Sequence, residues 1–187
     1  DVQDFYMKDV AGGKLFKAII IDPSMLGALP SESTSNSEVL RCWAGYELMM
    51  HRLFLAFYPF DNLPAGDIQI FYETYFELGL EIFMKQGIQI VFMFDEFEEM
   101  LKQLPVKFFL TLRGLRDANK RKLSYLTFTR TSLRNVTDHL GINQLDIEPF
   151  TELFNDSVVY VGPYNEIDGR NMVQDLMERN NRKYEAY

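Results

Sequence analysis

The chain has 187 residues, of which 47% are hydrophobic and 25% charged, and it contains 16 Phe and 10 Tyr. This length and composition predict one domain with a sizeable core and argue against disorder. The formal net charge of -8 disfavours a whole-surface attraction to nucleic acid or to an anionic membrane, but it allows a local basic patch.

The single cysteine, Cys42, excludes an internal disulfide and fits a reducing, cytoplasmic compartment. No apolar run reaches the length of a transmembrane helix, and no signal peptide opens the sequence. We therefore expect no membrane partner.

The first predicted elements are a strand and two helices. Lys17–Asp22 is rich in β-branched residues and predicts a buried strand. A polar loop follows at Ser31–Ser37, and apolar residues then recur at helical spacing over Glu38–Tyr58 and Asp67–Lys85. Two helices exceed what one crossover between strands requires, so we interpret residues 31–86 as a helical insertion.

The second predicted strand ends in two acids. Ile88–Phe94 is an apolar run without strict alternation, as expected for a strand covered on both faces, and Asp95 and Glu96 follow it. Ligands of open α/β sheets bind outside the carboxyl ends of the strands. Asp95 is therefore a candidate for holding Mg²⁺ through water, and Glu96 for orienting an attacking water. The alternative is that Asp95 caps the next helix and that the following acids form its solvated first turn.

A helix is predicted over Phe97–Ala118, with a kink at Pro105. It leads into a local basic cluster, which consists of Arg113, Arg116, Lys120, Arg121, Lys122 and Arg134. Arg113 and Arg116 are candidates for an arginine finger that reaches the nucleotide of a neighbouring subunit. The cluster is also compatible with a nucleic-acid contact, or with cations that are simply favoured at a helix C-terminus.

The third predicted strand, Leu123–Phe128, runs into Thr129 and Arg130. An Arg at such a strand end can bind phosphate oxygens in bidentate fashion. The alternative is that Arg130 is solvated or paired with Asp95 or Glu96. Both interpretations predict such a pair when no nucleotide is bound.

The last predicted elements are a strand at Ser157–Val161 and a helix at Asn165–Arg182, with Asn165 as its N-cap. Strands that alternate with helices predict an α/β fold with a mainly parallel sheet.

The order of these motifs resembles STAND-type NTPases and their AAA+ relatives over roughly residues 85–182. The resemblance rests on the oily strand that ends in Asp-Glu-Phe-Glu, the strand that ends in Thr-x-Arg-Thr-Ser-Leu, and the later strand that leads into a helix. It implies a three-layer P-loop NTPase-like fold that uses ATP and Mg²⁺. Asp95 would then be the Walker B residue that serves Mg²⁺, with Glu96 placed beside the attacking water, and Thr129 and Arg130 would sense the γ-phosphate.

One motif of that family is not found, because the sequence contains no G-x-x-x-x-G-K-[ST]. Gly12-Gly13-Lys14-Leu15 places Leu15 where Ser or Thr would bind Mg²⁺, so we interpret the two glycines as a turn. We expect either that the first strand and its P-loop precede Asp1 or that the chain is a relative that does not hydrolyse ATP. The predicted domains are an incomplete ATPase core over residues 1–164 and the start of a helical lid over residues 165–187.

Three functions follow from these observations. The first is an ATP-dependent switch of a signalling or defence ATPase, which implies self-association or a protein partner. The second is a non-catalytic α/β scaffold or interaction domain, and the third is a DNA-associated AAA+ ATPase, although the net charge does not favour a nucleic-acid partner. A conventional hydrolase is disfavoured, because the sequence has no G-x-S-x-G elbow.

Overall fold

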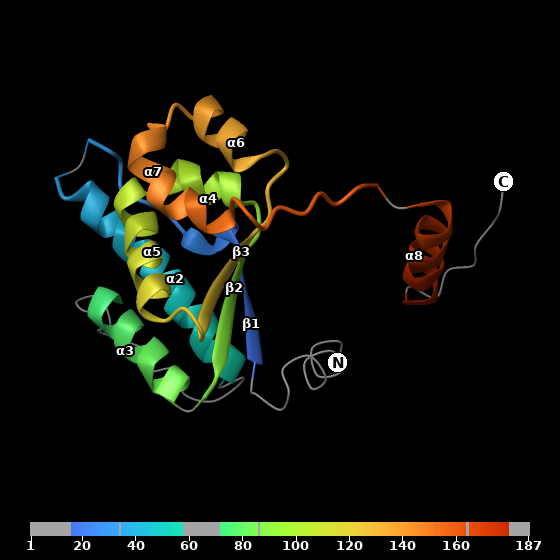
Figure 1. Ribbon diagram of the computed structural model, residues 1–187, viewed down its shortest axis with the longest axis horizontal. Helices are drawn as coiled ribbons and strands as arrows, with labels where there is room; N and C mark the ends of the chain where they lie inside the picture. Colours follow the sequence, from blue (N-terminus) through green and yellow to red (C-terminus); the bar gives the residue numbers. More distant parts are fainter. Residues whose placement is uncertain (1–15, 34, 58–71, 86, 164, 180–187) are drawn as a thin grey trace. The chain divides into compact units, whose positions relative to one another are not determined.

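The computed structural model describes residues 16–33, 35–57, 72–85, 87–163 and 165–179 (Figure 1). The chain divides into two compact units, of which the first ends at Leu153 and the second begins at Phe154. The first unit therefore ends before residue 164, where the sequence placed the domain boundary. The assignment of the second unit to a lid stays a prediction.

The first unit is built on a parallel sheet of three strands in the order β1-β2-β3, with β2 in the centre. These strands are β1 (Phe16–Ile21), β2 (Gln89–Phe94) and β3 (Leu123–Thr127). They confirm the first three predicted strands and the parallel α/β class. In the register, Ile19 of β1 lies beside Phe92 of β2, which in turn lies beside Tyr125 of β3.

Only one face of this sheet is deeply buried within the described residues. Ile90, Phe92 and Phe94 of β2 are fully buried, whereas the side chains between them are half-buried. On the same half-buried face, Leu126 is 44% exposed. The prediction that the second strand is covered on both faces is therefore wrong for the described residues. The physical reason is that the helices α2, α3 and α5 lie together on one side of the sheet (Figure 1), so the predicted third layer is not among the described residues.

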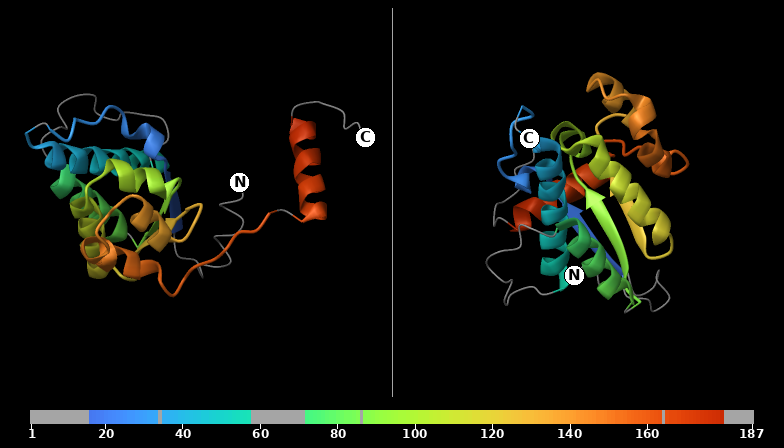
Figure 2. Two further views of the ribbon diagram at one scale, coloured as in Figure 1. Left: turned by 90° about the horizontal axis from the view of Figure 1, so that it is seen from above. Right: turned by 90° about the vertical axis from the view of Figure 1, so that its left-hand side faces the viewer.

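The two helices α2 and α3, which precede β2, lie within the segment predicted as a helical insertion. α2 spans Ser37–Phe57 and α3 spans Tyr72–Lys85, and the predicted helical residues 67–71 lie outside the described residues. A short 3₁₀ helix, η1 (Pro23–Leu26), precedes α2, and its N-cap Asp22 accepts a hydrogen bond from the Ser24 amide at 2.8 Å. Figure 2 shows α2 and α3 from two further directions.

The single helix predicted over Phe97–Ala118 is two helices in the structure. α4 (Phe97–Gln103) and α5 (Val106–Ala118) are separated by Leu104 and Pro105. Leu104 has an extended backbone, with φ −106° and ψ 142°. Proline disfavours the helical conformation at the preceding residue, so the kink predicted at Pro105 is a complete break.

Two helices after β3 were not predicted. They are α6 (Leu133–His139) and α7 (Gln144–Thr151), and α7 runs into the short 3₁₀ helix η3 (Glu152–Phe154). Each begins at a polar cap, because Ser132 accepts a hydrogen bond from the Asn135 amide and Asn143 accepts one from the Leu145 amide. These side chains satisfy amides that lack a partner within the helix.

The described residues of the second unit form the helix α8 (Glu166–Arg179). Asn165 accepts a hydrogen bond from the Asp168 amide at 2.8 Å, which confirms the predicted N-cap. The predicted strand at Ser157–Val161 is wrong, because this segment has no strand pairing and Val161 is 90% exposed. β-branched residues favour a strand only where a neighbouring strand and a packing surface exist, and the described residues of this unit provide neither.

Aromatic side chains fill the core between the buried sheet face and the helices. Tyr46 of α2 and Phe108 of α5 have ring centroids 5.0 Å apart. Gly45 makes this close approach possible, because a Cβ atom at that position would lie 2.6 Å from Phe108 Cε2. Phe97 stacks on Phe150 at 5.9 Å, which packs the start of α4 against α7.

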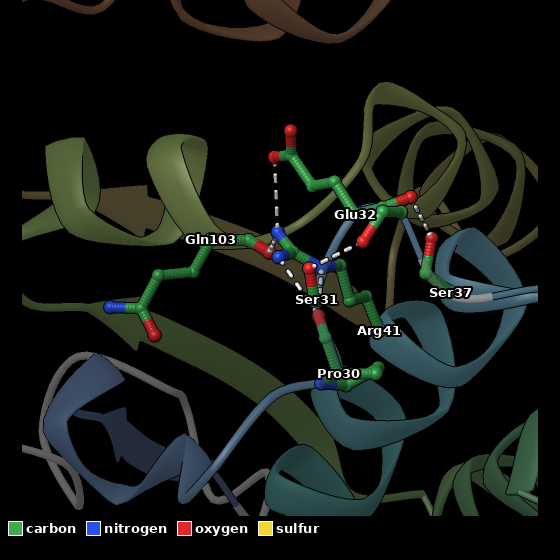
Figure 3. Close-up of polar contacts among 7 residues, drawn as sticks. Pro30, Ser31, Glu32, Ser37, Arg41 and Gln103 are labelled. Carbon is green, nitrogen blue, oxygen red and sulfur yellow. Dashed lines mark hydrogen bonds and ion pairs between the residues drawn. The ribbon is translucent and has the colours of Figure 1, made fainter.

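Arg41 of α2 anchors the other end of α4 (Figure 3). Its Nε and Nη2 atoms donate to the Pro30 carbonyl at 3.1 and 3.0 Å, and its Nη1 atom donates to the Gln103 carbonyl at 3.2 Å. Glu32 lies 3.4 Å from the same Nη1 atom. A cation at the carbonyls of a helix C-terminus is favourable, so Arg41 fixes the position of α4 relative to α2.

Candidate functional site

The carboxyl ends of the three strands are joined by backbone hydrogen bonds. The Asp95 amide donates to the Ile21 carbonyl at 3.0 Å, and the Phe128 amide donates to the Phe94 carbonyl at 2.9 Å. These bonds fix the residues that follow β2 relative to those that follow β3. Asp95 and Glu96 therefore lie at the same edge of the sheet as Thr129 and Arg130, as the parallel arrangement predicts.

Glu96 has a left-handed backbone, with φ 41° and ψ 50°. This conformation is uncommon for residues other than glycine and is sterically costly. It turns the chain sharply from β2 into α4, and it leaves the Glu96 side chain 56% exposed. Strained residues of this kind cluster at functional sites, so the conformation identifies Glu96 as a candidate functional residue.

Asp95 contacts its neighbour instead of capping α4. Its Oδ1 atom accepts a hydrogen bond from the Glu96 amide at 3.0 Å, and Glu96 occupies the N-cap position of α4 without a side-chain cap. The interpretation of Asp95 as the cap of the next helix is therefore wrong. Within the described ranges, Asp95 makes no ion pair with any Lys or Arg.

Arg130 pairs with Glu96 across the strand ends. Its Nη2 atom lies 3.6 Å from Glu96 Oε1, and the Arg130 side chain is 85% exposed, as expected if Arg130 pairs with Glu96. The backbone amide of Arg130 donates to Glu98 Oε1. The Thr129 hydroxyl donates to the Thr131 carbonyl at 2.6 Å, which stabilises the loop after β3.

A pocket of about 480 Å³ lies beside this ion pair, between α4 and α6. It has the size of a small-molecule site. Its lining combines carboxylates, cations, neutral polar side chains, a histidine and two apolar residues. These are Glu96, Glu98, Glu99, Lys102, Arg130, Thr131, Asn135, Val136, His139 and Leu140. Sequence reasoning missed Glu98 as a contact of Arg130, and it missed Asn135 and His139 because α6 was not predicted. The Ser132 cap is the local signal that would have indicated α6.

Arg113 takes part in contacts within its own chain. Its Nε atom donates to Asp117 Oδ2 and its Nη1 atom to the Pro149 carbonyl, both at 2.6 Å. The hydrogen bond from Arg113 also holds the pKa of Asp117 below its usual range. The bond to Pro149 ties α5 to α7, and the pair with Asp117 lies within α5. Neither contact involves the four strand-end residues, so a role as arginine finger stays a prediction.

The strand-end residues fit a hydrated Mg²⁺ better than a metal cage built by the protein. The described part of the chain holds no group of three or more His, Cys, Asp or Glu side chains arranged as metal ligands. Mg²⁺ usually keeps several waters and binds through one or two carboxylates together with substrate phosphates. Asp95 fits such a role, because its carboxylate is exposed and has one hydrogen-bonded oxygen.

No protein-family model matches the chain, and no curated protein matches it. A solved structure that it resembles is the ORC2 protein of Aeropyrum pernix, an AAA+ ATPase determined as ADPNP and ADP complexes. The TM-score is 0.52 at 13% sequence identity, and the similarity covers 95% of this chain but 39% of that one. This similarity concerns the α/β fold alone. It lends no support to a STAND-type assignment.

None of the described helices is both long enough and apolar enough to cross a lipid bilayer.

Proposed function

We propose that the strand ends form the Mg²⁺- and water-binding part of an AAA+-like ATPase site. The observation that carries the proposal is the left-handed Glu96 at the end of the central strand, with its carboxylate 3.6 Å from Arg130 at the end of the neighbouring strand. The two side chains meet from segments far apart in the sequence, at the edge where α/β sheets bind ligands.

Each residue has a distinct role in this proposal. Asp95 holds Mg²⁺ through water, and Glu96 orients the water that attacks the γ-phosphate. Arg130 exchanges its ion pair with Glu96 for phosphate oxygens, which a guanidinium binds in bidentate fashion. Thr129 keeps the Arg130 loop in place through its bond to Thr131.

The proposal requires a phosphate cradle, because the sequence contains no P-loop motif. Backbone N–H groups at a helix N-terminus usually provide such a cradle. ATP turnover therefore depends on a further polypeptide segment that brings these donors to the carboxyl edge of the sheet. The assignment to STAND-type switches rests only on the Asp-Glu-Phe-Glu and Thr-x-Arg motifs. Self-association through Arg113 would require that residue to leave Asp117 and Pro149.

The test compares wild type with two variants of the full-length protein, and it measures nucleotide binding and ATP hydrolysis in each. Wild type should bind Mg·ADPNP in isothermal titration calorimetry. Glu96→Gln should retain this binding and lose ATP hydrolysis, because the amide cannot accept the proton of the attacking water. Glu81→Gln is the matched control, since Glu81 lies outside the pocket, on α3, and pairs with Lys85 at 2.8 Å. Equal loss of turnover in both variants would contradict the role of Glu96.

A second candidate function is a non-catalytic α/β scaffold, which the lack of a P-loop motif in the sequence favours. This candidate predicts that Mg·ADPNP neither releases heat in calorimetry nor raises the melting temperature. The same titration therefore separates the two functions.

A further inference from the structure

A hydrogen bond between Glu98 and the backbone of Arg130 joins α4 to the loop after β3. The Glu98 Oε1 atom accepts this bond from a residue 32 positions further along the chain. Hydrogen bonds to a carboxylate are about twice as strong as neutral ones. Glu98 lies in the first turn of α4, where the helix dipole also favours a negative charge.

The Arg130 side chain is weakly held by contacts of its own. The guanidinium is 85% exposed, and its ion pair with Glu96 is long, at 3.6 Å. The loop is held to the sheet at Phe128, through bonds with the Phe94 carbonyl and the Phe97 amide. At Arg130 itself, the backbone bond to Glu98 holds the loop. Because the contacts of the side chain are weak, the position of the Arg130 backbone decides which region the guanidinium can reach.

We propose that Glu98 is a positioning residue for Arg130, an inference that rests on the proposed nucleotide site. Glu98 holds the Arg130 amide so that the guanidinium projects toward the position of the γ-phosphate. Glu98 itself does not contact the nucleotide. Its effect on binding therefore passes through Arg130 and vanishes when the Arg130 side chain is removed.

The first measurement needs no nucleotide. Hydrogen exchange of the Arg130 amide, followed by NMR, should be faster by about tenfold or more in Glu98→Ala, because a bond to a charged acceptor is lost. Glu98→Gln should restore most of the protection, since its carbonyl oxygen can still accept the bond. Glu99→Ala is the matched control from the same helix and should leave this amide unchanged. Unchanged exchange in Glu98→Ala would overturn the positioning role.

The second measurement is a double-mutant cycle on the Kd of Mg·ADPNP in the full-length protein. Glu98→Ala should weaken binding by about tenfold in the wild-type background and by less than about twofold in the Arg130→Ala background, because coupled residues are not additive. A loss that adds fully to that of Arg130→Ala would indicate a general structural defect and overturn the inference. If wild type does not bind ADPNP at all, the proposed function fails together with the phosphate part of the inference. The amide exchange then still decides whether Glu98 holds Arg130.

Discussion

The left-handed backbone of Glu96 predicts that glycine is more stable than alanine at this position, the reverse of their order inside a helix. Glu96→Gly and Glu96→Ala both remove the carboxylate and its ion pair with Arg130, so their difference isolates the backbone. With φ 41° and ψ 50°, a residue that carries a Cβ atom pays roughly 1–2 kcal/mol for the left-handed conformation. Glycine avoids this cost but loses about 0.5–1 kcal/mol through its greater freedom in the unfolded chain. Glu96→Gly should therefore be more stable than Glu96→Ala by about 0.75 kcal/mol, the difference between the midpoints of these ranges.

The assay is equilibrium unfolding in urea, with the free energy of unfolding compared between the two variants. The same pair of substitutions at Glu99, which lies in the helical turn of α4, is the control. There, glycine should be less stable than alanine by about 0.5–1 kcal/mol. The reasoning is refuted if alanine is at least as stable as glycine at position 96, because the strain inferred from the backbone would then not exist.

Three further predictions concern packing and pH. Gly45→Ala should destabilise the fold by about 1–3 kcal/mol, because its Cβ atom would lie 2.6 Å from Phe108 Cε2. The control is Gly114→Ala, whose Cβ atom would meet nothing within 4 Å and should not destabilise the fold. Equal urea midpoints for the two variants would contradict this. Burial raises the pKa of Tyr125 above its unfolded value of about 10. The neutral phenol therefore contributes to the free energy of unfolding below about pH 10, and this contribution is lost as the pH rises further. Tyr125→Phe should flatten this alkaline loss in unfolding scans, at a cost of about 1 kcal/mol at neutral pH from the lost bond to the Leu112 carbonyl; an unchanged alkaline limb would count against it. The pKa of Asp117 is lowered, so its carboxylate contributes to the free energy of unfolding above about pH 3.9, and this contribution is lost as the pH falls further. Asp117→Asn should therefore reduce the dependence of the urea midpoint on acidic pH. The same dependence in wild type and variant would disprove this.

The strands that are paired in the structure were predictable because their local composition agrees with their surroundings. Ile88–Phe94 is apolar apart from Gln89, and it forms the central strand between two partners. Ser157–Val161 has the same β-branched character, yet Val159 is 84% exposed. Composition describes what a segment can form, and pairing depends on neighbours that the local sequence does not specify. The helices α6 and α7 were missed because each is short and gains its stability from caps and from contacts such as that of Phe150 with Phe97.

The site was predictable to the extent that it follows from topology. Parallel strands end at the same edge, so the meeting of Glu96 with Arg130 followed from their places after two strands. The left-handed backbone of Glu96 and the bond from Arg130 to Glu98 were not predictable, because they depend on how α4 is packed against the loop after β3. The bond from Arg113 to the Pro149 carbonyl likewise needs the position of α7, which the sequence did not indicate.

The most direct test of the central claim is the Kd of Mg·ADPNP for the full-length protein and two variants at opposite ends of the sheet. Arg130→Gln removes the guanidinium at the carboxyl edge. Lys120→Gln removes an exposed cation from the turn before β3. The account predicts that wild type binds, that Arg130→Gln weakens binding by about tenfold or more, and that Lys120→Gln leaves the Kd unchanged. Absence of binding in wild type, or equal weakening by both variants, would contradict a nucleotide site at the ends of β2 and β3.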